Sequence, residues 1–227
     1  MVLASNSRVR ASPVRSHAAS DKARLLDATR SLIVEKGVTD FTVRDVLDAS
    51  RLSFRCFYQH FSGRDELLIT LMDETVRACA QQILASVPNS SGPLERLRSA
   101  VHVLFEQSAP DERGRPGLLS HFAPLTVSSH PASGRVALQP LLQVFTEMMA
   151  DAEQAGQVRP RLRSGAAATA VVHTALFLAG VASAGYGHPL TAAEVWDFCT
   201  GGLIRGWSPR EGSVRASEDA DQKPSRD

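Results

Sequence analysis

Polar side chains with the chemistry needed to contact a nucleic acid are concentrated over residues 53–59. The guanidinium group of Arg55 can bind guanine through two hydrogen bonds or hold a phosphate. The hydroxyl groups of Ser53 and Tyr58 can donate to phosphate oxygens, and the amide of Gln59 can do either. These residue types at this spacing predict one face of a short helix that meets a polyanion.

This segment is part of a longer pattern, residues 41–68, that predicts two short helices joined by a tight turn. We expect the first helix over 43–50, capped by Thr42, and the second over 54–60, capped by Ser53, because hydroxyl side chains are favoured N-caps. Apolar residues at helical spacing supply the inner face: Val43, Val46, Leu47, Leu52, Phe57 and Phe61. In such a motif the N-terminal half of the second helix enters the major groove of DNA. The pattern therefore predicts a DNA-binding helix-turn-helix.

Helical periodicity continues on both sides of the motif. A preceding helix is expected to begin near 20–21 and to end at 36, and a long helix is expected over 64–87 with Ser62 as its cap. Later helices are expected over 94–107, 136–156, 165–185 and 191–207, with a short one between loops at 108–117 and 123–134. No alternation typical of a β-strand has a useful length, so the predicted fold class is all-α with about nine helices.

The charge of the 227-residue chain is uneven. Residues 1–64 carry 11 Lys/Arg against 6 Asp/Glu, although the net charge of the whole chain is only +1. A positive N-terminal region suits a polyanionic partner at one end only. Residues 1–19 have little to bury and are expected to form a disordered basic arm. Two readings of this arm stay open: it is solvated, or it reaches a minor groove through Arg8, Arg10 and Arg15.

The three cysteines, Cys56, Cys79 and Cys199, are far apart in the sequence, and no Cys/His cluster has metal-ligand spacing. We therefore expect no metal site and no cofactor, and free thiols in a reduced cytoplasm. The N-terminus lacks the apolar core of a signal peptide, which also favours a cytoplasmic protein.

The nearly uncharged segment 165–185 almost reaches the length of a membrane span. Ala and Gly dominate it, and these small residues allow close approach of helices. We therefore favour a buried interface helix over a transmembrane span, and expect no membrane partner. A pocket-lining role is compatible with the favoured reading.

The helix-turn-helix resembles the DNA-binding domain of the TetR family of transcriptional regulators. The resemblance covers about residues 21–75 and rests on Thr42-Val-Arg-Asp-Val, Leu52-Ser, Phe57-Tyr-x-His-Phe61 and Arg64-Asp-Glu-Leu-Leu68. The sequence from His188 to Trp207 also resembles the last helix of that family. The resemblance implies an N-terminal DNA-binding head at 20–66 and a helical effector-binding and dimerisation body at 67–207. A charged tail over 208–227 is expected to be disordered.

Carried over position by position, the resemblance implies a DNA-facing set of residues. Its members are Thr42, Arg44, Ser53, Phe54, Arg55, Cys56, Tyr58, His60 and Arg64. Arg64 opens the connecting helix, where its charge and the helix N-terminal amides both favour a phosphate. Tyr58 and His60 can instead be packing or capping residues, and Cys56 can be a small filler.

Two positions depart from the family pattern. Arg51 stands in the turn where glycine is common, so either it adopts a left-handed conformation at some cost or the turn is rebuilt and its side chain reaches a phosphate. Leu47 stands where a small residue is common, and a leucine there can widen the angle between the two helices. Because both positions affect the local geometry, they affect which of this chain's residues the resemblance implies as base contacts.

The last helices carry features of a dimer interface. The candidate residues repeat at helical spacing: Val195, Phe198, Cys199, Gly202, Leu203 and Gly206. Gly202 and Gly206 are four residues apart and would let a second helix approach closely. With the 165–185 helix they make a candidate four-helix interface between two subunits, which the resemblance also implies.

A ligand pocket is expected between the long connecting helix and the helices of the body. Candidate apolar lining residues are Phe105, Phe122, Phe145, Met148, Met149 and Phe177, and candidate polar contacts are His102, His121 and His173. The simpler reading of each is an ordinary core residue. If an effector binds, this composition favours a hydrophobic or aromatic one.

The resemblance thus implies a dimeric DNA-binding regulator, a repressor released from a palindromic operator by a small, mostly hydrophobic ligand. Two rival classes are a helical enzyme and a helix-turn-helix used only for protein contacts. The sequence has no nucleophile elbow, phosphate loop, paired-carboxylate motif or HExxH to support an enzyme. The positive charge of the N-terminal region argues against the purely protein-binding role.

Overall fold

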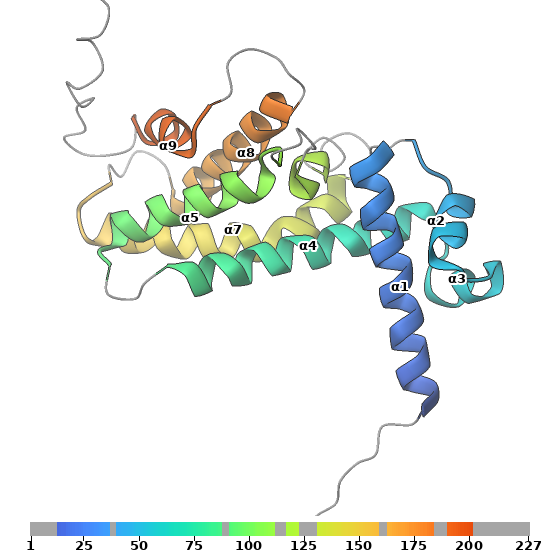
Figure 1. The fold of residues 1–227 in the computed structure, drawn as a ribbon. Helices are drawn as coiled ribbons and strands as arrows, with labels where there is room; N and C mark the ends of the chain where they lie inside the picture. The colour runs from blue at the N-terminus through green and yellow to red at the C-terminus, as the bar shows by residue number, and fades with distance from the viewer. Residues whose placement is uncertain are drawn as a thin grey trace, which may run out of the picture.

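The structure is a computed structural model that describes residues 13–36, 40–87, 91–111, 117–122, 131–158, 163–183 and 190–201. Figure 1 labels α1 (Pro13–Lys36), α2 (Val43–Ser50), α3 (Phe54–His60), α4 (Arg64–Ser86), α5 (Pro93–Ser108), α7 (Pro131–Gln154), α8 (Ser164–Ser183) and α9 (Ala192–Thr200). Residues 118–122 form a further short helical segment. The described ranges contain no β-strand, and the predicted all-α class is confirmed.

Helices α1, α2 and α3 form a head at the start of the long helix α4 (Figure 1). α1 packs on α2 and also contacts α3 and α4. Val46 and Phe57, which the sequence predicts for the head core, are fully buried, and so are Leu25 and Ile33 of α1. Burial of each such side chain contributes about 1.5–3 kcal/mol. The ring of Phe41, which the sequence analysis did not assign to the core, is also buried there.

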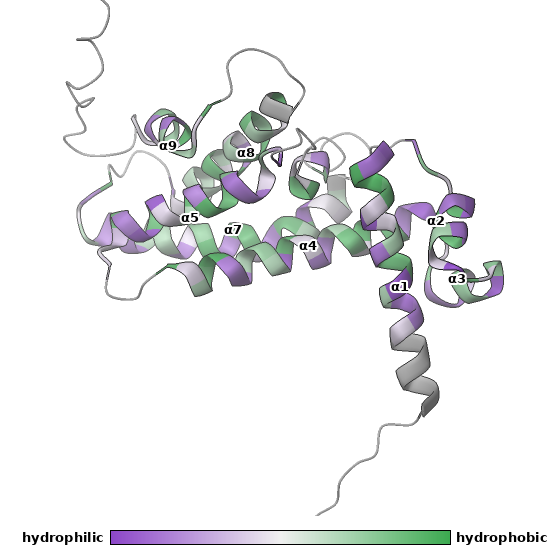
Figure 2. Ribbon diagram, in the orientation of Figure 1, coloured by the Kyte–Doolittle hydropathy of each residue, from purple (hydrophilic) through white to green (hydrophobic). Residues whose placement is uncertain are grey.

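Helix α4 continues from the head into the body, where it packs against α5 and α7 (Figure 1). α7 also packs along α8, and α9 contacts α5 and α8. Hydrophobic and hydrophilic residues alternate along α4 (Figure 2), as expected for a helix that buries one face. The body interior contains fully buried side chains of several helices, among them Leu71 of α4, Leu104 of α5, and Leu141 and Phe145 of α7. α4 is therefore a physical link between the head and the body.

The apolar helix α8 packs against α5 and α7. Its segment Ser164–Val181 has a mean hydropathy of 1.5 and is long enough to cross a membrane, but the core helix of a soluble protein meets the same criteria. Its buried residues are Ala167, Ala168, Val171, Val172, Ala175, Leu176 and Ala179. These contacts within the body favour the reading of α8 as a packed helix.

Two helices begin earlier than predicted, and both begin with proline. α1 starts at Pro13, so the residues from 13 to 19 are helical and the predicted disordered arm is too long. α7 starts at Pro131, inside the predicted loop at 123–134. Proline is well tolerated in the first turn of a helix because its missing N–H would have no helical partner there. The remainder of the predicted arm and the predicted tail lie outside the described residues.

The start of α4 also differs from the prediction. Its N-cap is Gly63, which offers no side-chain hydrogen bond, and not Ser62. The hydroxyl and the backbone N–H of Ser62 both donate to the carboxylate of Glu66 over 2.7 Å. These hydrogen bonds lower the pKa of Glu66. Ser62 therefore secures the entry to α4 through a side chain in the first turn.

Gly117 allows the 118–122 segment to approach the end of α5 closely. A Cβ atom at this position would lie 2.6 Å from the carbonyl oxygen of Ser108 and 2.7 Å from that of Gln107. Because these are backbone atoms, Gly117→Ala is expected to lower the free energy of unfolding by about 1–3 kcal/mol, measured by urea denaturation.

Gly165→Ala is the matched control for that variant. A Cβ atom there would meet only the Thr146 side chain, at 4.0 Å, and alanine favours helix formation. We expect this control to be as stable as the wild type or more stable. Equal stability of the Gly117→Ala variant and the wild type would contradict the close approach.

Candidate nucleic-acid interface

A capping box fixes the start of α2. The Thr42 backbone N–H donates to the Asp45 carboxylate over 2.7 Å, and the Asp45 N–H donates to the Thr42 hydroxyl oxygen over 3.2 Å. Hydrogen bonds from the Thr42 hydroxyl and backbone lower the pKa of Asp45 to about 2. Because the folded pKa is lowered, the stability that Asp45 contributes is present above its ordinary pKa of 3.8 and is lost as the pH falls through about 2. The predicted cap is confirmed.

The turn between α2 and α3 keeps a tight geometry without glycine. Arg51 has φ 55° and ψ 40°, and its backbone N–H donates to the Leu47 carbonyl. The N–H of Leu52 donates to the same carbonyl over 3.2 Å. Arg51 therefore adopts the left-handed conformation, which costs an L-residue roughly 1–2 kcal/mol, and the alternative of a rebuilt turn is wrong. Ser53 then caps α3 as predicted by accepting from the Cys56 N–H over 3.2 Å.

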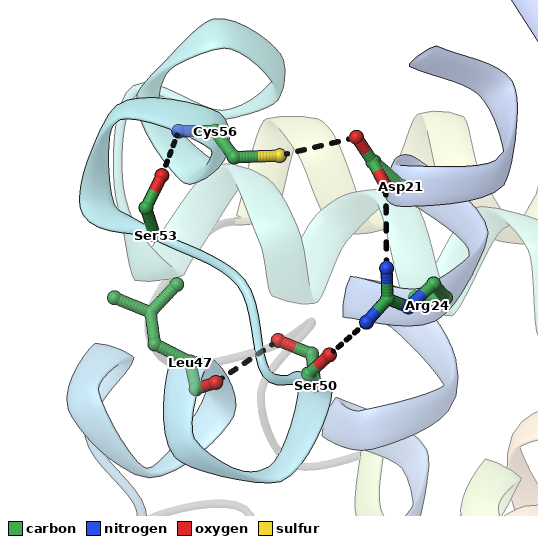
Figure 3. A network of polar contacts seen from close by, with 6 residues as sticks. All are labelled: Asp21, Arg24, Leu47, Ser50, Ser53 and Cys56. Carbon is green, nitrogen blue, oxygen red and sulfur yellow. Dashed lines mark hydrogen bonds and ion pairs between the residues drawn. The ribbon is translucent and has the colours of Figure 1, made fainter. Parts of the chain in front are cut away.

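Helix α1 holds both sides of this turn through Asp21 and Arg24 (Figure 3). Nη2 of Arg24 donates to the Ser50 carbonyl oxygen over 2.7 Å, which gives a partner to a carbonyl at the end of α2. Nη1 of Arg24 pairs with the Asp21 carboxylate over 3.5 Å, and the Cys56 thiol donates to the same carboxylate over 3.6 Å. Side chains of α1 thus tie α2 and α3 together. These contacts were not predicted, although Asp21 and Arg24 are three positions apart and therefore lie on one face of a helix.

Six members of the predicted DNA-facing set are exposed: Thr42, Arg44, Ser53, Phe54, Arg55 and Tyr58. Phe54 is 53% exposed and Tyr58 is 60% exposed. These two residues are four apart, so they lie on the same side of α3. Arg55 and Gln59 are exposed next to them, whereas Phe57 is fully buried. The outer side of α3 therefore presents one guanidinium, one phenol, one amide and one phenyl ring.

The other three members, Cys56, His60 and Arg64, are partly buried. Burial and the neighbouring Asp21 carboxylate raise the pKa of the Cys56 thiol. The Cys56 side chain therefore points toward α1, in agreement with the interpretation that Cys56 is a small packing residue. The guanidinium of Arg64 lies 4.7 Å over the ring of Phe41. Arg64 thus packs at the junction between α4 and the head, and its predicted contact with a phosphate stays a prediction.

The predicted pocket residues fall into two groups. Those buried in the body are Phe105, Phe122, Phe145, Met148 and Met149. His121 is partly buried, burial lowers its pKa, and its Nε2 atom has no hydrogen-bond partner among the described residues. His102 and His173 are only partly buried. Phe177 is wrong as a lining residue, because it lies on the outer side of α8 and is 66% exposed.

A separate hollow of about 560 Å³ lies between α4 and the start of α7. Its lining residues are Ile69, Thr70, Asp73, Arg77, Ala132, Ser133, Val136 and Ala137. The ion pair between Arg77 and Asp73, 2.8 Å long, is part of this wall. None of the predicted pocket residues lines this hollow, which was not predicted from the sequence.

The predicted dimer residues also divide by exposure. Phe198 on α9 is 73% exposed, which leaves its ring free for a partner. Val195 is fully buried within the chain and is therefore a core residue, contrary to the prediction. Cys199 is partly buried, and burial raises its pKa to about 11. The remaining predicted interface residues, Gly202, Leu203 and Gly206, lie outside the described residues.

Comparison with known proteins supports the reading of the head. Residues 25–71 match the family described as bacterial regulatory proteins, tetR family. The chain is 29% identical over 91 residues to the HTH-type transcriptional repressor KstR2 of Mycobacterium tuberculosis, which covers 38% of this chain and 44% of that protein. It is 27% identical over 84 residues to the HTH-type transcriptional regulator BetI of Brucella anthropi, covering 37% and 43%. The chain thus spans less than half the length of these curated relatives.

The fold of most of the chain also has a known counterpart. The structure of the fatty acid degradation regulator FadR from Bacillus halodurans superimposes with a TM-score of 0.65 at 19% sequence identity. The superposition covers 80% of this chain and 98% of that one. At this identity the similarity establishes the arrangement of helices in the body as well as in the head.

The strain at Arg51 can be measured directly. Arg51→Gly is expected to raise the free energy of unfolding by about 0.5–1 kcal/mol, because relief of the left-handed strain outweighs the larger entropy of glycine in the unfolded chain. The measurement is chemical denaturation followed by circular dichroism. Ala49→Gly, in the last turn of α2, is the matched control and should lower stability. A loss of stability in Arg51→Gly would rule out strain at this turn.

Proposed function

Because the chain belongs to the TetR family of bacterial regulatory proteins, we propose that it is a homodimeric transcriptional regulator that binds a palindromic DNA operator. The observation that carries the proposal is the outer side of α3, where Arg55 and Tyr58 are exposed. Phe57 and the Ser53 cap hold that helix in place. A fixed helix with exposed hydrogen-bonding side chains is suited to reading base edges in a major groove.

Dimerisation gives this surface its selectivity. Two copies of α3 related by a two-fold axis can reach successive major grooves when they lie about 34–36 Å apart. The exposed rings of Phe177 on α8 and Phe198 on α9 are candidates for the subunit interface. A change in the distance between the two copies of α3 would weaken binding to an operator of fixed spacing.

The regulator is proposed to be a cytoplasmic repressor that a small, mostly hydrophobic ligand releases from its operator. The composition of the body supports an apolar ligand, because aromatic and methionine side chains of α5 and α7 are buried there and a site formed among them would favour apolar groups. The partly buried His121 could supply one polar contact. No catalytic role is proposed for any residue.

Binding to duplex DNA is the first test. The full chain is expected to enrich one palindromic sequence from a random pool, with an affinity that falls steeply as salt increases. Arg55→Ala should change the base preference, whereas Arg44→Ala should weaken all duplexes alike and reduce the salt slope by about one. Fluorescence anisotropy at several salt concentrations measures both effects.

Three outcomes of that experiment are informative. Enrichment of one palindrome supports the proposal. Equal losses on every sequence for the Arg55→Ala and Arg44→Ala variants would reject the division between base and phosphate contacts. Failure to prefer any sequence over random DNA would reject the operator and favour a helix-turn-helix that contacts proteins.

The proposed interface has its own test. Phe177→Glu and Phe198→Glu should each shift the chain toward monomer, because a buried charge without a partner is strongly unfavourable. Sedimentation velocity measures the oligomeric state. Leu84→Glu is a matched control, since Leu84 is also an exposed apolar residue, at 54%, but lies on α4. A dimer that survives both phenylalanine substitutions would place the interface elsewhere.

A further inference from the structure

Phe54 is an exposed aromatic ring at the first position of α3. It is 53% exposed, although the next aromatic residue of the same helix, Phe57, is fully buried. The Ser53 cap fixes the backbone at this point through its hydrogen bond to the Cys56 N–H. The ring is therefore held at the outer end of the helix, with no place in the core of the head.

The chemistry of Phe54 differs from that of its exposed neighbours. Arg55, Tyr58 and Gln59 can all form hydrogen bonds with base edges or phosphates. Phe54 cannot, because a phenyl ring has no donor or acceptor. Among the base edges of the major groove, the apolar group is the C5-methyl of thymine, and phenylalanine is one of the residues that contacts it.

The surroundings of Phe54 favour DNA over a protein as its partner. Arg55 is the next residue on α3, and Arg44 is exposed on the neighbouring helix α2. One cation next to the exposed ring and a second exposed on α2 of the same head suit a polyanion, whereas an apolar protein surface at the ring would require the adjacent cation to lose water without compensation. The ring is thus placed where the N-terminal residues of a recognition helix meet base edges.

We propose that Phe54 is a specificity-determining residue that reads the methyl group of one thymine in each operator half-site. The inference rests on the proposed function, because it assumes that α3 enters a major groove. It adds the identity of one base pair, A·T, and the kind of contact that selects it. Arg55 then contacts either the adjacent base pair or a phosphate next to it.

Removal of a single methyl group from the DNA is the decisive test. Operators are first enriched from random duplexes with the full chain. Each thymine of the half-site is then replaced by deoxyuridine, one symmetric pair at a time, and the dissociation constant is measured by fluorescence anisotropy at fixed salt. At one position the loss of the methyl is expected to weaken wild-type binding about fourfold per half-site.

Protein variants assign that effect to the ring. Phe54→Ala should bind thymine and deoxyuridine operators equally, and Phe54→Leu, which keeps an apolar side chain, should retain a preference for thymine. Arg44→Ala, assigned above to a phosphate contact, is the control: it should weaken binding to both operators by the same factor and keep the full difference between the two bases. Because Phe54 is exposed, circular dichroism spectra of its variants should match the wild type.

The outcomes separate this inference from the proposed function. Enriched half-sites without a fixed A·T pair, or deoxyuridine tolerated at every position, would overturn the role of Phe54 and leave sequence-specific DNA binding intact. A thymine preference that persists in Phe54→Ala would also overturn it. If no sequence is enriched at all, the result would contradict both the proposed function and the role of Phe54.

Discussion

The seven residues of α3 depend on the burial of one aromatic ring. A segment this short does not form a stable helix in water by itself, and the fully buried Phe57 holds it against the head. The ring of Phe57 also packs near that of Phe61, with the centroids 5.7 Å apart, so the chain that leaves α3 is held by the same core. Since helical side chains project at fixed intervals, this anchor determines which residues of α3 face outward.

Local features of the head could be predicted from the sequence because each depends on neighbouring residues. Thr42 and Asp45 are three positions apart, and their capping box follows from their types alone. The left-handed conformation of Arg51 is one of two alternatives that its place after a helix allows, and the observed φ of 55° decides between them. Contacts between distant positions could not be predicted. Nothing in the sequence joins Cys56 to Asp21, which lies 35 residues away, because that contact exists only once α1 has packed on the motif.

The packing of the body was less predictable than that of the head, because the sequence of α8 has no Asp, Glu, Lys or Arg that would identify its solvent-exposed face. In an amphipathic helix the polar residues show which side meets water. α8 is apolar or small over nearly its whole length, so periodicity could not show that Phe177 faces outward while Val172 is buried. On α9 the fully buried Val195 and the exposed Phe198 are only three positions apart. Such assignments depend on which neighbours α8 and α9 meet, and the sequence does not contain that information locally.

Movement in the body can reach the head along α4, which contacts α1 at one end and α5 and α7 at the other. At the junction, Arg64 of α4 lies over Phe41, and Glu66 accepts two hydrogen bonds from Ser62. These contacts are short and involve the first turn of α4, so a displacement of α4 changes the position of the head. Coupling between two sites typically amounts to about 1–3 kcal/mol and acts equally in both directions. Under the proposed function, a few apolar contacts between a ligand and the body would supply that much, and ligand binding there would weaken DNA binding without contact with any residue of α3.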